Sequence, residues 1–301
     1  MNNAISEFYK VMRSTGLEPP EFIEPGKLHR FPGIGKRKNN QAGWCVLFED
    51  EKGGSFGDWS SGLTKNWKYK PDTPYNFSPD EKASFKQRVL DSKAAANAAR
   101  TARQLEAADR ATLIWNNASS ISRNHPYLIS KNIDIDEDEN KAREYKGDIL
   151  LPIEDFNNKI TSIQFIKPDG RKLLLAGGRK QDCFIHVSGN FADTSHVIIC
   201  EGWATGWTLA QDDPYALVLA AIDAGNLKSV ARSVLSYLDY FRLIIAGDDD
   251  QLTPGNPGAT KAREAAIASG ALLALPQWPD DAPKTLTDFN DLYSWNTWGV
   301  A

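Results

Sequence analysis

The last third of the sequence alternates short apolar runs with segments that favour helices, and this alternation restricts the fold more than any other feature. The apolar runs lie at 197–200, 216–220, 241–246 and 271–275. A continuous apolar run is typical of a strand that is buried on both faces of a sheet. Strands separated by helices of about ten residues indicate parallel βαβ units. We therefore predict an open, mostly parallel α/β domain over residues 193–301.

Acidic side chains follow three of these predicted strands. Glu201 comes directly after the first, Asp248 and Asp250 come after the third, and Asp288 and Asp291 come after the fourth. Open α/β sheets bind ligands at the carboxyl ends of their strands, so we expect these carboxylates to converge on one edge. Oxygen ligands of this kind suit Mg²⁺ or Mn²⁺. Any one of the acids alone would fit a helix cap or a solvated turn, but their recurrence at three strand ends favours a divalent metal site.

Charge is unevenly distributed along the chain. Residues 191–301 contain 6 basic and 14 acidic residues, a net charge of −8, whereas residues 1–190 contain 29 basic and 25 acidic residues, a net charge of +4. An acidic region with clustered aspartates suits divalent cations, and a more basic region suits a polyanion. This division is consistent with a metal site in the last third and a nucleic-acid surface elsewhere.

Residues 1–72 are expected to form a small β-rich module. Tryptophan and glycine are dense there, as in short hairpins that are broken by glycine pairs. Lys36, Arg37 and Lys38 lie in the predicted loop between Gly35 and Gly43. Basic residues beside aromatic rings suit single-stranded nucleic acid, because cations contact phosphates and rings stack on bases. The alternative is a plain hairpin core with a solvated loop.

A helical region at 78–125 is predicted to follow a linker at 71–77. Ser78 is a candidate N-cap, with Pro79 at the first helical position and Glu81 three residues after the cap. The following residues contain neither glycine nor proline up to about position 117 and should form one long helix or two. The helical region is expected to end at the segment that contains His125.

Residues 126–192 are expected to form a basic β-meander. Its predicted strands lie at 148–153, 160–166, 171–175 and 183–187. Pro152 has no N–H to donate, which favours an edge position for the first strand. The basic residues at the turns and strand starts suit nucleic-acid phosphates and include Arg171, Lys172, Arg179 and Lys180.

The sequence has no pattern typical of a zinc site, a disulfide scaffold, a membrane-spanning helix or a signal peptide. The 3 cysteines, Cys45, Cys183 and Cys200, are odd in number and far apart. This pattern fits a reducing cytoplasm and excludes a disulfide scaffold or a multi-cysteine zinc ribbon, so we expect no zinc. No apolar run approaches the roughly 20 residues that a membrane-spanning helix needs, and the start shows no signal-peptide pattern. We expect a cytoplasmic protein without a membrane partner.

The acidic motifs resemble the Toprim domain, which is shared by bacterial-type primases, topoisomerases and some nucleases. The signature of that domain is a Glu-Gly pair after one strand and an Asp-x-Asp after a later strand. Glu201-Gly202 and Asp248-Asp249-Asp250 match it in order and context. The resemblance covers about 195–295. It implies that Glu201, Asp248 and Asp250 are catalytic and that a metal is bound with help from Asp288 or Asp291.

Other segments resemble the Toprim primases of phages and plasmids. These segments are His125-Pro126-Tyr127-Leu128, the strand around Pro152, 162–166, Gly177-Gly178-Arg179, 26–31 and Gly57-Asp58-Trp59. The turn Asp223-Ala224-Gly225-Asn226 also resembles that subgroup, which implies that Gly202, Gly225 and Asn226 lie in turns near the active site. Two departures are the missing zinc ribbon and Thr205, which replaces a further aspartate that some members have.

The resemblance implies a DNA primase that makes short primers on single-stranded DNA from nucleoside triphosphates during phage or plasmid replication. It also implies that Arg171, Lys172, Arg179 and Lys180 hold the template. A replicative helicase is the expected partner, in trans or fused after residue 301, because no GxxxxGK[ST] loop is present. Two alternatives remain. The same metal site could serve a Toprim nuclease, or the chain could be a non-catalytic nucleic-acid-binding module of replication.

Overall fold

The computed structural model describes most of the chain as two compact units. The described residues are 3–70, 78–135, 141–192, 194–238 and 241–299. Unit 1 comprises Met1–Ala102 and unit 2 comprises Arg103–Ala301. The predicted linker at 71–77 lies outside the described residues, and the predicted four-part division at 1–72, 78–125, 126–192 and 193–301 stays a prediction.

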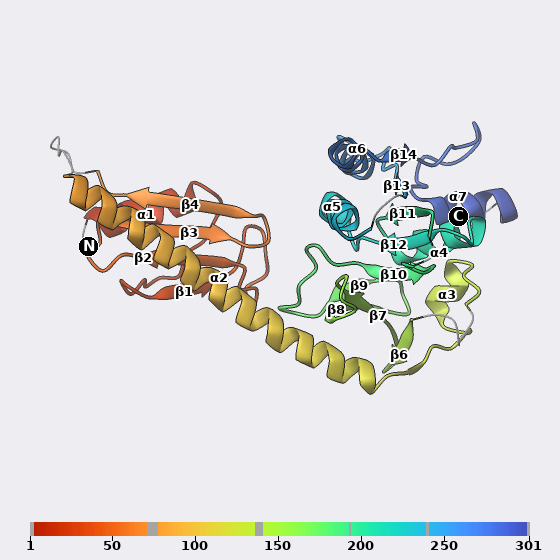
Figure 1. Ribbon diagram of the computed structural model, residues 1–301, viewed down its shortest axis with the longest axis horizontal. Coiled ribbons are helices and arrows are strands. Elements are labelled where there is room, and N and C mark those ends of the chain that lie inside the picture. Colours follow the sequence, from red (N-terminus) through yellow and green to blue (C-terminus); the bar gives the residue numbers. More distant parts are fainter. Residues whose placement is uncertain (1–2, 71–77, 136–140, 193, 239–240, 300–301) are drawn as a thin grey trace. The chain divides into compact units, whose positions relative to one another are not determined.

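Unit 1 contains an antiparallel sheet in the order β1-β2-β3-β4 (Figure 1). Its strands are β1 (Leu28–Phe31), β2 (Gly43–Leu47), β3 (Gly53–Asp58) and β4 (Leu63–Lys68). The helix α1 (Asn3–Arg13) packs on one face of this sheet through Phe8 and Met12, which share a core with Phe56 and Trp67. The β-rich module that the sequence predicts is therefore present, with a helix that the sequence analysis did not predict.

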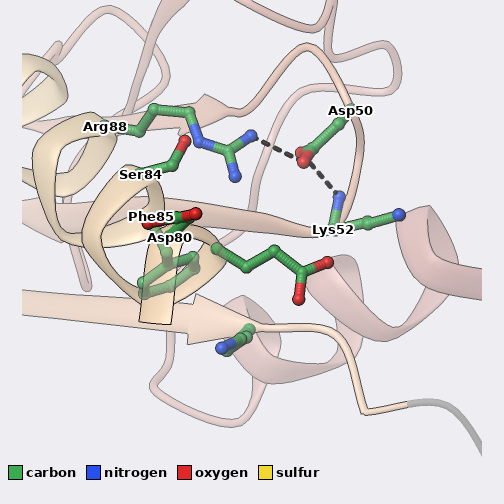
Figure 2. A pocket seen from close by; sticks show the side chains of 8 residues that line it. Asp50, Lys52, Asp80, Ser84, Phe85 and Arg88 are labelled. Carbon is green, nitrogen blue, oxygen red and sulfur yellow. Dashed lines mark hydrogen bonds and ion pairs between the residues drawn. The ribbon is translucent and has the colours of Figure 1, made fainter. Parts of the chain in front are cut away.

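The first part of the helix α2 (Pro79–Asn116) belongs to unit 1 and packs there through Phe85 and Val89, which contact Val46 and Phe48. Arg88 Nη1 lies 2.6 Å from Asp50 Oδ2 and ties the helix to the β2–β3 turn. Figure 2 shows this ion pair at the wall of a pocket of about 430 Å³, where the Lys52 backbone N–H also donates to Asp50. The pocket is lined by acidic and basic side chains in equal number.

The start of α2 follows the predicted capping box. Glu81 N–H donates to Ser78 Oγ at 3.2 Å, and Ser78 N–H donates to Glu81 Oε2 at 2.9 Å. This reciprocal arrangement satisfies two backbone donors that a helix start leaves without partners. The structure has one uninterrupted helix of 38 residues, and its last part belongs to unit 2, where Ala111 packs against Leu150 and Ile163.

The meander forms an antiparallel sheet in unit 2 in the order β5-β6-β7-β8-β9. Its strands are β5 (Ser119–Ser120), β6 (Arg143–Tyr145), β7 (Asp148–Glu154), β8 (Ile160–Ile166) and β9 (Lys172–Leu174). The predicted edge position of the first strand is wrong, because β7 is an inner strand. The proline is accommodated because β6 pairs only with the first part of β7, so that Pro152 lies beyond the end of β6.

Two further predictions about this region are wrong. The strand predicted at 183–187 is β10 (Ile185–Ser188), which pairs antiparallel with β12 (Leu217–Ala220) in the other sheet of unit 2. The segment around His125 does not end the helical region. It begins a short helix, α3 (Pro126–Ser130), whose N-cap is His125. The first difference arises because tertiary contacts decide which sheet a short strand joins. The second arises because the His125 side chain caps a new helix.

The second sheet of unit 2 confirms the predicted open α/β domain. Its order is β10-β12-β11-β13-β14, and all pairs except β10–β12 are parallel. The strands after β10 are β11 (His196–Cys200), β12 (Leu217–Ala220), β13 (Arg242–Ala246) and β14 (Leu272–Ala274). The connecting helices are α4 (Trp203–Asp212), the short η1 (Ala224–Asn226) followed by α5 (Leu227–Tyr237), and α6 (Pro257–Ser269). A last helix, α7 (Phe289–Trp298), follows β14.

Alternate residues of β11 enter two different cores, as a strand buried on both faces requires. Ile198 and Cys200 pack with α4 and the meander strands, while Val197 and Ile199 pack with α5 and α6. The helices α5 and α6 accordingly cover one face of the sheet (Figure 1). Among the described helices, none is both long and apolar enough to cross a membrane.

Candidate active site

The strand register places the first two acidic motifs side by side. Cys200 at the end of β11 is the register partner of Ala246 at the end of β13. Glu201 therefore leaves the sheet beside Gly247, directly before Asp248. Because the strands are parallel and adjacent, residues 201 and 247–250 emerge at the same edge, which is the ligand-binding edge of sheets of this type.

Asp248 is the most perturbed carboxyl group of this edge. Its Oδ1 atom is buried and has no hydrogen-bond partner. Burial and the negative charges of Glu201, Asp288 and Asp250 raise its pKa to about 8, against the opposing effect of Lys172. A buried carboxylate without a partner is costly, so this oxygen points to a cation as its missing partner.

Glu201 belongs to the same electrostatic group. Burial, together with the charges of Asp223 and Asp250, raises its pKa, while Lys172 and the backbone N–H of Ala224 act in the opposite direction. Like charges that are held together each disfavour ionisation of the other. The charge of Glu201 also helps to raise the pKa of Asp248, so these two carboxyl groups are coupled electrostatically.

Asp250 is oriented by the start of α6. Its Oδ2 accepts a hydrogen bond from Gly258 N–H at 2.9 Å, where the helix dipole favours negative charge. A Cβ atom on Gly258 would lie 2.8 Å from Asp248 O and 2.9 Å from Asp250 Oδ2. The glycine thus permits the close approach that holds the acidic loop against the helix.

The structure distinguishes the two acids of the last motif. Asp288 is the N-cap of α7, and its Oδ1 accepts from Asp291 N–H at 2.9 Å. Asp291 pairs with Lys131 Nζ at 3.1 Å and accepts from Thr287 N–H at 3.0 Å. Because the charge of Asp288 also acts on Asp248 while Asp291 is engaged by Lys131, the geometry favours Asp288 as the third acidic position.

The acidic edge suits a divalent cation in ligand chemistry and charge, but not in the spacing of its described side chains. Among the residues that the structure describes, no three histidine, cysteine, aspartate or glutamate side chains are close enough together to hold a metal ion. The carboxylates are instead coupled through charge, with one buried oxygen left without a partner. A hard cation would remove their mutual repulsion and supply that partner.

Of the four basic residues predicted to bind the template in the meander, three pair with an aspartate and the fourth, Lys172, lies near the acidic edge. Arg171 Nε lies 2.6 Å from Asp169 Oδ2, Arg179 Nη2 lies 2.7 Å from Asp155 Oδ2, and Lys180 pairs with Asp223. Lys172 is exposed on β9, and its positive charge partly counteracts the rise in the pKa of both Glu201 and Asp248. Its Nζ atom lies 3.5 Å from where a Cβ of Gly202 would be. The structure therefore brings Lys172 and Gly202 to the acidic edge.

The other predicted basic cluster belongs to unit 1. Lys36, Arg37 and Lys38 are exposed in the loop between β1 and β2. An exposed basic loop is compatible with the predicted contact to nucleic acid and equally with a solvated turn.

The turn after β12 is held by Asn226. This buried side chain donates to the carbonyl oxygens of Lys180 and Cys183 at 2.9 Å and of Ala221 at 3.0 Å. Next to it, Ile222 has a φ of 78°, an unfavourable conformation for a β-branched residue. Gly225 lies in η1, where an added Cβ would come within 3.3 Å of Asp223 Oδ1.

Two residues of this edge were missed in the sequence analysis. The sequence analysis placed Asp223 in a turn but did not count it among the acids of the site, although it lies three residues after the end of β12 and its charge helps to raise the pKa of Glu201. Lys131 is the C-cap of α3. Burial lowers its pKa, but the charges of Asp288, Asp291 and Asp248 outweigh that effect, so the pKa is raised. Its place beside Asp291 depends on a long-range contact that no local pattern indicates.

The chain is similar to two curated proteins of Escherichia coli that are both called DNA primase TraC. One is 34% identical over 90% of this chain and 26% of its own length, and the other is 31% identical over 94% and 20%. The chain thus spans about a quarter of the first relative and a fifth of the second.

The chain is also similar to solved structures of two primases. The primase fragment of the bacteriophage T7 primase-helicase protein is 14% identical, with a TM-score of 0.39 over 90% of this chain and 96% of that one. The DnaG primase catalytic domain bound to ssDNA is 15% identical, with a TM-score of 0.37 over 57% and 54%.

A family model described as "Toprim domain" matches residues 196–295. This range contains the parallel strands from β11 to β14 and the acidic residues that follow β11, β12 and β13. It also contains most of α7 with its N-cap Asp288. The match over residues 196–295 agrees with the resemblance drawn from the sequence motifs alone.

Proposed function

We propose that this chain is a DNA primase that joins nucleotides into short primers on a single-stranded DNA template. The observation that carries the proposal is the group of coupled carboxylates around the unpartnered oxygen of Asp248 in a Toprim domain. The similarity to DNA primase TraC along most of the chain supports the choice of primase among Toprim activities.

In this proposal Glu201, Asp248, Asp250 and Asp288 hold Mg²⁺ or Mn²⁺. Such an ion, when bound, stabilises negative charge on the phosphates during an in-line displacement. Lys172 offsets the charge of the acidic group and would contact a nucleotide phosphate. Asp291 and Lys131 support the third acidic segment through their ion pair.

Template binding is assigned to the basic residues around the meander. Arg171, Arg179 and Lys180 each pair with an aspartate, and a template phosphate would compete with that carboxylate. Binding that depends on such cations weakens as salt rises. The loop at Lys36, Arg37 and Lys38 would add a second, independent contact.

The remaining parts of the proposal follow from the reaction. Primers serve the replication of a phage or plasmid, so we expect a replicative helicase as partner and the cytoplasm as the place of action. Neither zinc nor a membrane is needed for the chemistry that the acidic edge supports.

The proposal is tested by incubating the chain with single-stranded DNA, all four nucleotides and Mg²⁺ or Mn²⁺. Labelled products are then resolved by length. We expect short oligonucleotides from the wild type and a loss of at least about 100-fold in Asp248→Asn, since that change removes transition-state charge stabilisation. Asp109→Asn, an exposed position on α2, is the matched control and should remain active.

Other products would change the assignment. A template that the wild type shortens, while Asp248→Asn leaves it intact, would identify a Toprim nuclease. DNA binding without product, and without any effect of Asp248→Asn, would identify a non-catalytic nucleic-acid-binding module.

A further inference from the structure

The middle aspartate of the loop after β13 has different partners from its two neighbours. Asp249 Oδ1 accepts from Asn256 Nδ2 at 2.6 Å, and Oδ2 accepts from Gln251 Nε2 at 2.7 Å and from Trp278 Nε1 at 2.9 Å. A carboxylate that receives three donors is satisfied by the protein itself. Asp248, in contrast, has an oxygen without a partner.

Asn256 links Asp249 to the rest of the acidic loop. Its Oδ1 accepts from Asp250 N–H at 2.9 Å and from Ala259 N–H at 3.3 Å, while its Nδ2 donates to Asp249. Its φ of 42° is left-handed, a conformation that asparagine tolerates better than most residues. One side chain therefore sets the Asp250 backbone, caps α6 and holds Asp249.

Asp249 also joins the second acidic segment to the third. Its backbone N–H donates to Thr287 O at 2.7 Å, and Thr287 directly precedes Asp288. The Trp278 bond connects the same carboxylate to the segment between β14 and α7. The spacing between Asp248, Asp250 and Asp288 thus depends on what holds Asp249.

We propose that Asp249 is a positioning residue, held by Trp278, Asn256 and Gln251, which orients Asp248 and Asp250 and fixes the Asp288 segment beside them. The inference rests on the proposed function, because it takes Asp248 and Asp250 to hold a divalent cation. The inference gives Trp278 a role in metal affinity. Its described hydrogen bond goes to Asp249 and to none of the predicted metal-binding carboxylates.

The test is Mn²⁺ binding by titration calorimetry without nucleotide or template. Trp278→Phe removes the indole N–H and keeps an aromatic ring without changing charge. We expect about tenfold weaker Mn²⁺ binding, because outer-shell partners typically contribute a factor of about 10–100 to metal affinity. Gln251→Ala, at an exposed position, removes another donor to Asp249 and should weaken binding in the same direction.

Trp207→Phe is the matched control. It removes an indole bond to Asp134 O at 3.1 Å, which lies outside the acidic loop, and should leave Mn²⁺ affinity unchanged. Circular dichroism verifies that each variant is folded at the temperature of the titration.

The outcomes separate the inference from the proposed function. Unchanged Mn²⁺ binding in both Trp278→Phe and Gln251→Ala would overturn the inference, because the bonds to Asp249 would then not matter for metal affinity. Tighter binding in both would also overturn it, because Asp249 would then be a metal ligand that these bonds keep from the ion. An equal loss in Trp207→Phe would also overturn it. The proposed function would be contradicted instead if the wild type bound no Mn²⁺, or if Asp248→Asn bound Mn²⁺ as tightly as the wild type does.

Discussion

At the scale of single residues, the chemistry of the acidic edge depends on neighbours more than on residue type. Asp248 and Asp249 are adjacent aspartates, yet burial and like charges raise the pKa of Asp248 to about 8. Burial also raises the pKa of Asp249, but the bonds from Asn256, Gln251 and Trp278 outweigh it and lower that pKa. The pKa values of two identical, adjacent side chains are thus shifted in opposite directions.

The raised pKa of Asp248 predicts a pH-dependent effect on stability in metal-free protein. Because the folded-state pKa, about 8, lies above the ordinary value of 3.8, ionising Asp248 destabilises the fold. This cost is absent below pH 3.8, grows up to about pH 8 and is complete above it. Asp248→Asn should therefore raise the free energy of unfolding by about 2 kcal/mol or more at alkaline pH.

Urea unfolding in the presence of a chelator checks this prediction, at about pH 4.5 and about pH 8.5. The gain in Asp248→Asn should be much smaller at the lower pH, and Asp109→Asn should show no gain at either. Equal stability of wild type and Asp248→Asn at both values would show that Asp248 carries no uncompensated charge.

At the scale of elements, strand ends and helix starts place the site. The register of β11 and β13 brings Glu201 beside the acidic loop, and the start of α6 holds Asp250. The turn after β12 is shaped by Asn226, which ties it to the segment that carries Lys180. Each element contributes through its terminus, where backbone groups are available.

Asn226 should therefore be important for the stability of unit 2. Asn226→Ala removes the donor to three carbonyl oxygens, and the bonds to those of Cys183 and Ala221 are buried. It should reduce the free energy of unfolding by about 2–4 kcal/mol. Urea unfolding measures the loss. Asn117→Ala, whose amide donates within the exposed end of α2, should cost far less. A similar effect of both changes would refute this role of Asn226.

At the scale of the whole molecule, the two units have separate cores, and their candidate contacts to nucleic acid are separate as well. The acidic edge, the meander and its basic residues all belong to unit 2, while the exposed loop with Lys36, Arg37 and Lys38 belongs to unit 1. The contribution of this loop to DNA binding can therefore be measured independently of the metal site.

Replacing Lys36, Arg37 and Lys38 together by alanine should weaken single-stranded DNA binding and reduce its salt dependence. Each phosphate contact to a single strand contributes about 0.7 to the slope of log K against log salt, so the slope should fall by up to about 2. Fluorescence anisotropy at several salt concentrations measures it. Lys82→Ala with Lys86→Ala, at exposed positions on α2, is the control. An unchanged slope would show that the loop is merely solvated.

Much of the fold was predictable because it is encoded locally. The apolar runs of the last third, the capping box at Ser78 and the aromatic strands of unit 1 all follow from side-chain periodicity and short-range hydrogen bonds. The acids after β11 and β13 were predicted from the same pattern, since a parallel sheet brings strand ends to one edge.

Other features were decided by tertiary structure. The transfer of β10 to the second sheet, the inner position of β7 and the ion pair between Lys131 and Asp291 depend on contacts between segments far apart in the chain. The same is true of the difference between Asp248 and Asp249. The sequence alone determines which residues bear charge and which strands are buried. The folded structure decides which charges are paired, because pairing depends on where distant donors such as Trp278 come to lie.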